Sequence, residues 1–533
     1  MNSENPGLQL QHSGAVVEQL RARLRELTEG GKGIDEYQVP CRVLAQNWTR
    51  QSAALRFLEY AQAFPVVEFA ARAAHAFIVD SAREIVHRSA ALSAELGVEF
   101  PSDPMEAVAT REYIEIGRQL LTRSAANDRP ITIGDDSHER DLRDSTRRFA
   151  QSVVAPEAER IHREDLLVPE HFIAQMSDMG YFGMSVPEEY GGVGMSNLMM
   201  VVATEELSAA SLPAAGSLIT RPEILTKGLL AGGTERQKRA WLPRIASGEI
   251  MVAVSVTEPN IGSDVASINC RADDAEVGGK RGFVINGAKA WCTFAGRADI
   301  LALLARTERD AALGHKGLSL FIVEKDRFTG HTFGMTQSTG GRMTGKADAT
   351  LGYRGMHSFT LQFQDFFVSA QNLVGEEDGR GKGFYLQMGG FAAGRLQTGG
   401  RAVGLAQAAL EAVARYAKER PQFGKPIAEY QSTQYELGAM AAELEAARQL
   451  TYAAARSADA SAPDAELQAA MAKLFSCRIA VNVTQRGQVL HGGWGYAEEY
   501  AISRYVADAL VLPIFEGVEP ILEMKVIARA LLR

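Results

Sequence analysis

The stretch MVAVSVTEPNIGSDVASI, residues 251–268, decides how the middle of this chain folds. Its first half alternates apolar residues as a half-buried strand does, and its second half is a turn rich in Gly, Ser, Asn and Asp. A strand that ends in such a turn exposes backbone amides and hydroxyls, which favour phosphate or a polarised ring carbonyl. A tight turn in which Asp and Ser side chains cap their own backbone is the alternative interpretation.

About twenty residues further on, the stretch GFVINGAKAWCTFAGRADI (282–300) adds an aromatic surface. Its Asn286-Gly287 pair predicts a hairpin turn. In the strand that follows, alternation puts Trp291 and Thr293 on the same face. A Trp face beside a hydroxyl suits a flat heteroaromatic ring, so we expect a ring-binding surface here.

A single carboxylate near the end of the chain is the candidate catalytic group. Glu516 lies in PIFEGVEPI (513–521), between apolar residues such as Phe515 and Val518. Apolar surroundings disfavour the ionised form of a carboxyl group, which makes it a better base for abstracting a proton. The alternative interpretation is a helix-terminal Glu followed by a Gly turn.

Composition and charge fit a soluble enzyme with several domains. The chain has 533 residues, of which 46% are hydrophobic and 23% are charged, enough for two or three cores. Its net charge of -9 argues against nucleic acid as a partner, because binding driven by counterion release needs a basic face.

The cysteines and histidines do not predict a metal site or disulfides. The four cysteines form no CxxC pair, and the ten histidines are dispersed without an HExxH pattern. We therefore expect reduced thiols and no metal. The cysteines are Cys41, Cys270, Cys292 and Cys477.

No targeting signal or membrane span is expected. The N-terminus MNSENPGLQLQHSG is polar, without the layout of a secretory leader or a transit peptide. No window approaches eighteen uncharged apolar residues, so we predict a cytoplasmic protein with no membrane partner.

Four regions separate along the chain by periodicity and composition. We expect a helical N-terminal extension over residues 1–136, a second helical domain over 137–250, a β domain over 251–372 and a C-terminal helical bundle over 373–533. Ser13 is the candidate N-cap of the first helix. The apolar positions of that helix are Val17, Leu20, Leu24 and Leu27.

Ordered motifs along residues 138–533 resemble those of the acyl-CoA dehydrogenase family. They are EEYGGVGM (188–195), LLAGGTERQKRAWLPRIASGE (229–249), TEPNIGSD (257–264), INGAKAWCT (285–293), GRAVGLAQAALEAVARYAKERPQFGKPIAEYQ (400–431), HGGWGYAEEY (491–500) and FEGVEPI (515–521). The resemblance implies an α+β fold, mostly α: a helical domain, a β-barrel or β-sandwich domain and a C-terminal four-helix bundle. The helical N-terminal domain is an addition to this core.

The resemblance also implies FAD as cofactor and assigns roles to matching positions. Glu516 would remove the α-proton of an acyl-CoA thioester while the β-hydrogen leaves as hydride to the flavin. Some relatives carry the base on the helix around residues 391–400, but position 394 is Gly, so Glu516 is the only candidate. The implied FAD-binding residues are Val256, Thr257, Ser263, Trp291, Thr293, Arg420, Gln422, Phe423, Gln488, Gly492 and Gly493.

Among these, the segment RPQFGKP (420–426) resembles the one that reaches the FAD of a neighbouring subunit, which implies a homo-oligomer, a dimer or a tetramer. The role of Gln488 is less defined, because the family has its Gln one position later, where this chain has Val489.

The acyl substrate is the least determined feature. Cations in the loops around residues 337–346 and 352–359 would pair with a substrate carboxylate or with CoA phosphates, and surface solvation is the alternative. The candidate substrate-binding residues are Ser263, Arg342, Arg354, Arg395 and Gly517.

A helical extension before a complete dehydrogenase resembles the enzymes that oxidise (2S)-methylsuccinyl-CoA to mesaconyl-CoA in the ethylmalonyl-CoA route. Their electrons pass to an electron-transfer flavoprotein. A dehydrogenase for another short or branched acyl-CoA, a flavin oxidase or monooxygenase, and a non-catalytic scaffold remain alternatives.

Overall fold

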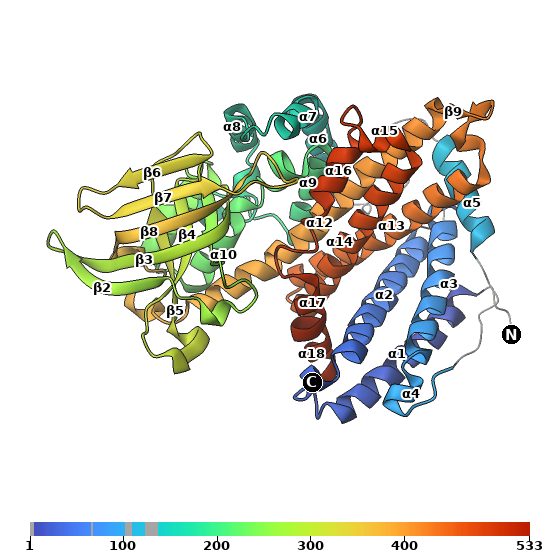
Figure 1. Ribbon diagram of the computed structural model, residues 1–533, viewed down its shortest axis with the longest axis horizontal. Helices are drawn as coiled ribbons and strands as arrows, with labels where there is room; N and C mark the ends of the chain where they lie inside the picture. Colours follow the sequence, from blue (N-terminus) through green and yellow to red (C-terminus); the bar gives the residue numbers. More distant parts are fainter. Residues whose placement is uncertain (1–4, 65–67, 102–108, 123–136) are drawn as a thin grey trace. The chain divides into compact units, whose positions relative to one another are not determined.

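The computed structural model describes residues 5–64, 68–101, 109–122 and 137–533 (Figure 1). The chain divides into two compact units, and each is described by itself. Unit 1 comprises residues 1–145 and 398–533, and unit 2 comprises residues 146–397. Long helices and a single large sheet dominate, so the α+β, mostly helical fold class is confirmed. The boundaries of the four predicted domains stay a prediction.

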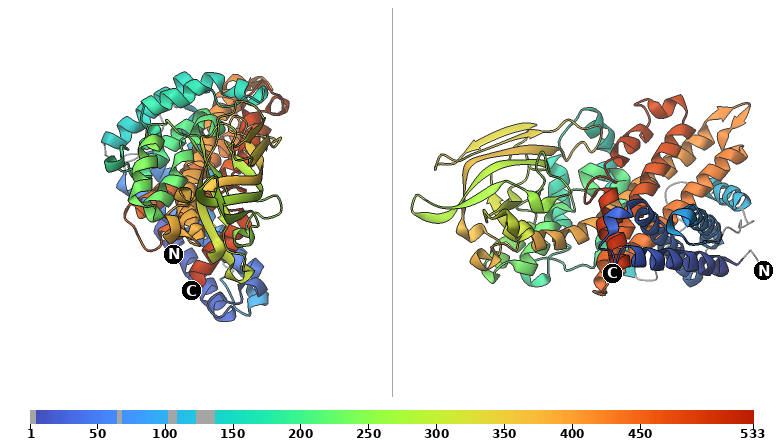
Figure 2. Two further views of the ribbon diagram at one scale, coloured as in Figure 1. Left: turned by 90° about the vertical axis from the view of Figure 1, so that its left-hand side faces the viewer. Right: turned by 60° about the horizontal axis from the view of Figure 1, so that its bottom comes forward.

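In unit 1 the N-terminal helices pack along the C-terminal ones. Helix α13 packs against α2, α3 and α5, and α14 packs against α2. Figures 1 and 2 show the N-terminal helices (blue) beside the C-terminal helices (orange to red). The main helices are α1 (Pro6–Leu27), α2 (Gln38–Ala63), α3 (Glu68–Ala90), α5 (Thr110–Thr122), α13 (Gln431–Asp459), α14 (Ala465–Leu490) and α16 (Ile502–Ala509).

One apolar core joins the two ends of the chain in this unit. Leu20, Leu24 and Leu44 come from the N-terminal helices, and Leu474 and Leu531 from the C-terminal ones. Burying apolar area is the main favourable term in folding, so residues distant in sequence stabilise each other here. The N-terminal extension is therefore part of the same core as the tail of the chain.

The first helix begins earlier than predicted. The N-cap is Asn5, whose side chain accepts a hydrogen bond from the amide of Gly7, with Pro6 at the first helical position. Ser13, the predicted cap, lies inside α1, where it is buried and its hydroxyl donates to the carbonyl of Gln9 at 3.0 Å. The Ser13 prediction is wrong because an Asn-Pro start upstream extends the helix.

In unit 2 a helical layer packs on the sheet. Buried residues of α10 and α11, among them Leu225 and Leu242, form a core with Val252, Ile300 and Ile322 of the strands. This core takes up the apolar side chains on one face of the central strands. The helices include α8 (Glu170–Asp178), α9 (Asn197–Ala210), α10 (Arg221–Gly232) and α11 (Glu235–Ala246), and α12 (Gly383–Glu419) runs on into unit 1.

The sheet has eight strands in the order β1-β4-β2-β3-β8-β7-β6, with β5 paired to β4. β1 pairs with β4 in parallel, with Val252 opposite Ile300. The antiparallel pair β3 and β8 continues the sheet toward β6. The strands are β1 (Val252–Ser255), β2 (Arg271–Val277), β3 (Lys280–Thr293), β4 (Ile300–Arg306), β5 (Leu318–Glu324), β6 (Thr332–Thr336), β7 (Arg342–Ala347) and β8 (Ser358–Ser369).

The predicted hairpin turn at Asn286-Gly287 is wrong. β3 runs through both residues, and the turn from β2 to β3 is formed by Gly278 and Gly279. At Asn286 the register between β3 and β8 shifts, and the Asn286 side chain donates to Asp365 Oδ1 at 3.1 Å. Asn-Gly here forms a β-bulge, which also needs the left-handed freedom of glycine.

Gly287→Ala is expected to lower the free energy of unfolding by about 1–3 kcal/mol. Gly287 has φ +139°, and a Cβ there would lie 2.8 Å from the Cα of Cys270. Urea denaturation measures the loss. Gly334→Ala on β6, where a Cβ would be 3.7 Å from Thr344 Cγ2, is the matched control. Equal stability of the two variants would show that the bulge carries no strain.

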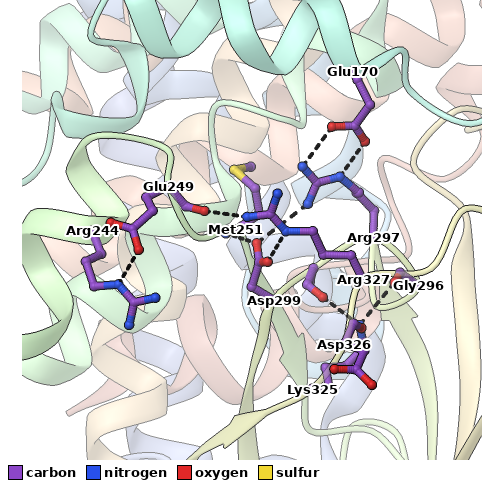
Figure 3. Close-up of polar contacts among 11 residues, drawn as sticks. Glu170, Arg244, Glu249, Met251, Gly296, Arg297, Asp299, Lys325, Asp326 and Arg327 are labelled. Atoms are coloured by element: carbon purple, nitrogen blue, oxygen red, sulfur yellow. Dashed lines mark hydrogen bonds and ion pairs between the residues drawn. The ribbon is translucent and has the colours of Figure 1, made fainter. Parts of the chain in front are cut away.

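A charged network ties helix α8 to the sheet (Figure 3). Arg297 pairs with Glu170 at the start of α8, and its guanidinium lies 3.6 Å from Asp299, just before β4. Arg327 also pairs with Asp299 and donates to the carbonyl of Glu249 at 2.6 Å. These bonds fix the N-terminal ends of β1 and β4, and the turn that is predicted to bind a ligand follows the opposite end of β1.

Among the described residues, none of the helices has both the length and the apolar character needed to cross a bilayer.

Candidate active site

The predicted FAD-binding residues of unit 2 lie at the end of β1 and in the second half of β3. The amide of Ala290 donates to the carbonyl of Thr257 at 2.8 Å, so the two segments are adjacent. Val256 is buried, and Thr257 is half-buried. Trp291 is 59% exposed, with φ +58°, and Thr293 is half-buried two residues later. The structure thus brings an exposed aromatic side chain and two hydroxyls together.

A buried ion pair, which the sequence analysis missed, holds this arrangement. Lys289 is fully buried, and its Nζ donates to the carbonyl of Val256 at 2.8 Å and to Glu258 Oε1 at 3.0 Å. The Glu258 carboxylate in turn accepts hydrogen bonds from two backbone amides. Asn269 donates to Oε2 at 2.8 Å, and Cys270 donates to Oε1 at 2.7 Å. A buried charge needs such partners. The turn after β1 is therefore bonded to β3 and to the start of β2.

Cys292 faces away from the exposed Trp291, as strand alternation predicts. Its thiol is fully buried and lies 3.2 Å from Ser255 Oγ. Burial raises the pKa of the Cys292 thiol to about 12. Burial also raises the pKa of Cys270, to about 11. Both thiols stay protonated at neutral pH and lack the character of a nucleophile.

The predicted substrate-binding residues in the loops and strands of unit 2 differ in their surroundings. Arg342 on β7 and Ser263 in the turn after β1 are exposed. Arg354 is half-buried, lies 3.4 Å from Asp165 and donates to the carbonyl of His162 at 3.1 Å. A substrate carboxylate at Arg354 would compete with Asp165, whereas Arg342 has no such competitor among the described residues.

One His and Asp cluster in the described part of the chain has ligand atoms close enough together to hold a metal ion, namely Asp165, His331 and His357. His357 Nε2 is 3.1 Å and His331 Nε2 is 4.0 Å from the carboxylate. Burial lowers the pKa of His357, opposed by Asp165. The Arg354 guanidinium shares this carboxylate, so a metal cation bound here would lie next to a positive charge.

In unit 1, the segment from Arg420 forms a two-stranded hairpin. β9 (Pro421–Gln422) pairs with β10 (Lys425–Pro426), and Phe423 and Gly424 make the turn with φ +51° and +85°. Phe423 is 95% exposed, and Gln422 is exposed beside it. Binding residues are disproportionately found on loops, and Phe423 lies at such a position.

The end of α14 carries the other predicted FAD-binding residues of this unit. Gly492 has φ +61°, and a Cβ on Gly492 or Gly493 would meet nothing within 4 Å. Open space over two glycines allows a ligand to approach the backbone closely. Gln488 instead donates to the carbonyl of Gly495 at 3.0 Å, which gives it a structural bond in this turn.

Glu516 lies in a left-handed turn with Gly517, at φ +54° and +101°. The carboxylate is half-buried, and its Oε2 atom is buried without a hydrogen-bond partner among the described residues. Lys473 Nζ donates to the carbonyl of Gly517 at 2.7 Å, and the Arg401 guanidinium lies 4.7 Å from the centre of the Phe515 ring. A buried carboxylate oxygen without a donor is suited to accept a proton.

Helix α12 carries Arg395, which is half-buried. Two residues later in unit 2, Gln397 is buried, and both atoms of its amide lack a hydrogen-bond partner in the described part of the chain. Buried orphan amides are uncommon and mark places where a ligand or water completes the bonding. Gln397 could not be found from the sequence, because a Gln inside a long helix is usually a surface residue.

Comparison with known proteins decides the family. The models for the N-terminal, middle and C-terminal domains of acyl-CoA dehydrogenases match residues 136–249, 253–366 and 381–532. The chain belongs to the acyl-CoA dehydrogenase family. It is an oxidoreductase of the type that acts on CH–CH bonds with a flavin as acceptor.

Two relatives and one solved structure illustrate the similarity. The (2S)-methylsuccinyl-CoA dehydrogenase of Cereibacter sphaeroides is 41% identical over 450 residues, which cover 82% of this chain and 78% of that protein. The mitochondrial isovaleryl-CoA dehydrogenase of Solanum tuberosum is 34% identical and covers 75% of this chain and 91% of its own length. The butyryl-CoA dehydrogenase of Megasphaera elsdenii has a TM-score of 0.68 at 29% identity, covering 76% of this chain and 100% of that one.

Proposed function

We propose that this acyl-CoA dehydrogenase oxidises (2S)-methylsuccinyl-CoA to mesaconyl-CoA, using FAD and passing electrons to an electron-transfer flavoprotein. The observation that carries the proposal is the extent of the match to the Cereibacter sphaeroides enzyme. That match covers 82% of this chain, whereas the domains common to the family span residues 136–532. The match therefore extends beyond the three family domains, further than that of isovaleryl-CoA dehydrogenase, which covers 75% of this chain.

In this proposal Glu516 is the general base. Its Oε2 atom, buried and without a hydrogen-bond partner among the described residues, takes the α-proton of the thioester. The α-proton is only weakly acidic, so the developing enolate oxygen needs a fixed donor, and the backbone amide of Glu516 supplies one. Because the Oε2 atom of Glu516 is buried, little water competes for its proton.

The residues at the end of β1 and in β3 fit a flavin. Trp291 offers an exposed aromatic face, and Thr257 and Thr293 offer hydroxyls next to it. Val256 adds a backbone position that Lys289 fixes by a hydrogen bond to its carbonyl. When bound, FAD accepts the β-hydrogen of the substrate as a hydride.

Further contacts to FAD are proposed from the hairpin and the glycines of unit 1. Phe423, with Arg420 and Gln422, would reach the FAD of a second copy of this chain, so the proposed active form is a homo-oligomer. The open backbone at Gly492 and Gly493 would lie against the same cofactor. Ser263 would contact FAD phosphate or the pantetheine of CoA.

The free carboxylate of a methylsuccinyl group needs a cation. Arg342 is the better-placed candidate of unit 2, since Arg354 already contacts Asp165. Arg395 on α12 is proposed on the CoA or substrate side, with Gly517 beside the base. A charge-assisted bond to the carboxylate would discriminate against uncharged acyl groups of similar size.

Anaerobic titration of the purified FAD-containing protein tests the proposal. Racemic methylsuccinyl-CoA should bleach the flavin absorbance at least ~10-fold faster than butyryl-CoA or isobutyryl-CoA at equal concentration, by the discrimination a hydrogen-bonded pocket gives. Faster bleaching by butyryl-CoA or isobutyryl-CoA would reassign the substrate within the family. Peroxide formation in air without an electron-transfer flavoprotein would favour an oxidase. If no thioester bleaches the flavin, a non-catalytic scaffold would be favoured.

A further inference from the structure

We propose that the N-terminal helices position the catalytic base, by holding the turn at Glu516 and Gly517 through Glu523 and Leu522. This inference rests on the proposed role of Glu516. The family's domains match this chain only from residue 136 onward, so they assign no role to the N-terminal extension. The inference gives the extension a role. All the contacts that carry it lie within unit 1.

The polar connection runs through Glu523. This side chain is fully buried in the π-helical segment η11 (Leu522–Ala528), seven residues after the base. From α2, Arg42 Nε donates to Glu523 Oε2 at 2.7 Å, and Gln46 Nε2 donates to Glu523 Oε1 at 2.7 Å. The N-terminal helix thus supplies two donors to a buried carboxylate on the tail of the chain.

Arg478 extends this connection toward the base. Its guanidinium, on α14, pairs with both Glu523 and Glu519. Glu519 begins the short helix α17 (Glu519–Ile521), three residues after Glu516. A shared guanidinium couples the two carboxylates, so a displacement of Glu523 moves the segment that follows the base.

The apolar connection runs through Leu522. This side chain is fully buried and belongs to the core that contains Leu44 and Cys41 of α2. A Cβ at Gly517 would lie 3.0 Å from Leu522 Cδ2, so the leucine packs directly under the turn. Helix α2 therefore supports Leu522 from one side, and Leu522 supports Gly517 from the other.

The turn needs such support because its backbone is strained. Glu516 is a non-glycine residue with φ +54°, a conformation that persists only where the surroundings over-determine it. Lys473 Nζ holds the Gly517 carbonyl at 2.7 Å from α14. Two further restraints on the turn come through Leu522 and Glu519, and both are linked to α2. Without α2, the carboxylate would sample other orientations.

Arg42→Ala combined with Gln46→Ala in the full-length, FAD-containing protein tests the inference. The flavin is bleached anaerobically with saturating racemic methylsuccinyl-CoA, or with butyryl-CoA if that thioester is the faster one for the unchanged protein. The expected result is a bleaching rate per bound FAD that falls about 10- to 100-fold, since a small misplacement of a catalytic group has effects of this size. The thioester concentration for half-maximal rate should stay within about twofold, because the substrate-binding residues are untouched.

Two controls separate positioning from general stability. Asp35→Ala removes an exposed ion pair with Lys525 in η11, and Arg56→Ala removes an exposed ion pair with Glu59 on the same helix α2. Both should bleach at the rate of the unchanged protein. Arg42→Lys, which keeps a donor for Glu523, should restore part of the rate.

An unchanged rate per bound FAD in the double variant would overturn the inference, even if the variant melts earlier or binds less FAD. If the double variant does not fold, Gln46→Ala alone removes one donor and no charge, and should show a smaller loss in the same direction. Failure of the proposed function looks different. In that case Glu516→Gln would bleach normally, or no thioester would bleach the unchanged protein.

Discussion

Glu516→Gln is expected to slow bleaching of the flavin by its thioester substrate about 10²- to 10⁴-fold, the usual effect of removing a general base. The amide has nearly the same shape as the carboxyl group but cannot accept the α-proton. The Oε2 atom of Glu516 has no hydrogen-bond partner among the described residues, so the substitution breaks no bond to it. Stopped-flow absorbance under anaerobic conditions measures the rate.

Binding should be separable from chemistry in this variant. The FAD content and the affinity for CoA should match those of the unchanged protein, because the proposed FAD-binding residues are intact. Glu499→Gln, at an exposed position in the same C-terminal region, is the matched control and should bleach at the normal rate. Bleaching of the Glu516→Gln protein at close to the normal rate would exclude Glu516 as the base.

Much of the fold could be predicted because its signals are local. The alternation in residues 251–255 and the apolar runs of the later strands correspond to β1, β4, β5 and β8. The errors occurred where a residue type has two uses. Ser13 fits an N-cap but is an interior helical residue bonded to Gln9, and Asn286-Gly287 fits a hairpin but forms a bulge beside Asp365.

The candidate site was predicted in part, for a related reason. Exposed groups such as Trp291 and Phe423 sit at strand ends or loop tips, where residue type alone is informative. Partners that come from distant elements could not be found. Nothing in the sequence pairs Asp165 with Arg354 and His357, because that contact depends on how a loop after α7 (Ala155–Arg163) meets the start of β8.

The N-terminal extension shows the same limit. Its helical periodicity predicts buried faces, and Leu20 and Leu24 are indeed buried. Periodicity does not say what those faces cover. The structure shows that they pack on Leu474 and Leu531 near the tail of the chain, and that contact is what gives Arg42 and Gln46 access to Glu523.

Lys289→Met is expected to lower the free energy of unfolding by about 3–5 kcal/mol, the cost of leaving one partner of a buried ion pair alone. Glu258 would keep the hydrogen bonds from the amides of Asn269 and Cys270 but lose the Lys289 ammonium group, which lies 3.0 Å away. The carbonyl of Val256 would lose its donor as well. Because Val256 and Thr257 are proposed to hold the flavin, the variant should also release FAD on gel filtration.

A second substitution distinguishes the ion pair from simple loss of packing. In Lys289→Met with Glu258→Gln, neither charge of this buried pair remains, and the Gln carbonyl can still accept a hydrogen bond from the backbone amide of Cys270. Replacing both members of a buried pair is often close to neutral, so most of the lost stability should return. Retention of FAD should recover less, because the Val256 carbonyl still lacks its donor and the turn after β1 is held less firmly.

Lys280→Met is the matched control for this experiment, since Lys280 is exposed at the first position of the same strand. It should unfold and bind FAD like the unchanged protein. Urea denaturation gives the stabilities, and flavin absorbance per protein gives the FAD content. If the free energy of unfolding of Lys289→Met lies within about 1 kcal/mol of that of the unchanged protein, the ion pair stabilises the fold no more than an exposed salt bridge would. In that case the hydrogen bonds between the strands would be enough to hold the turn after β1 in place.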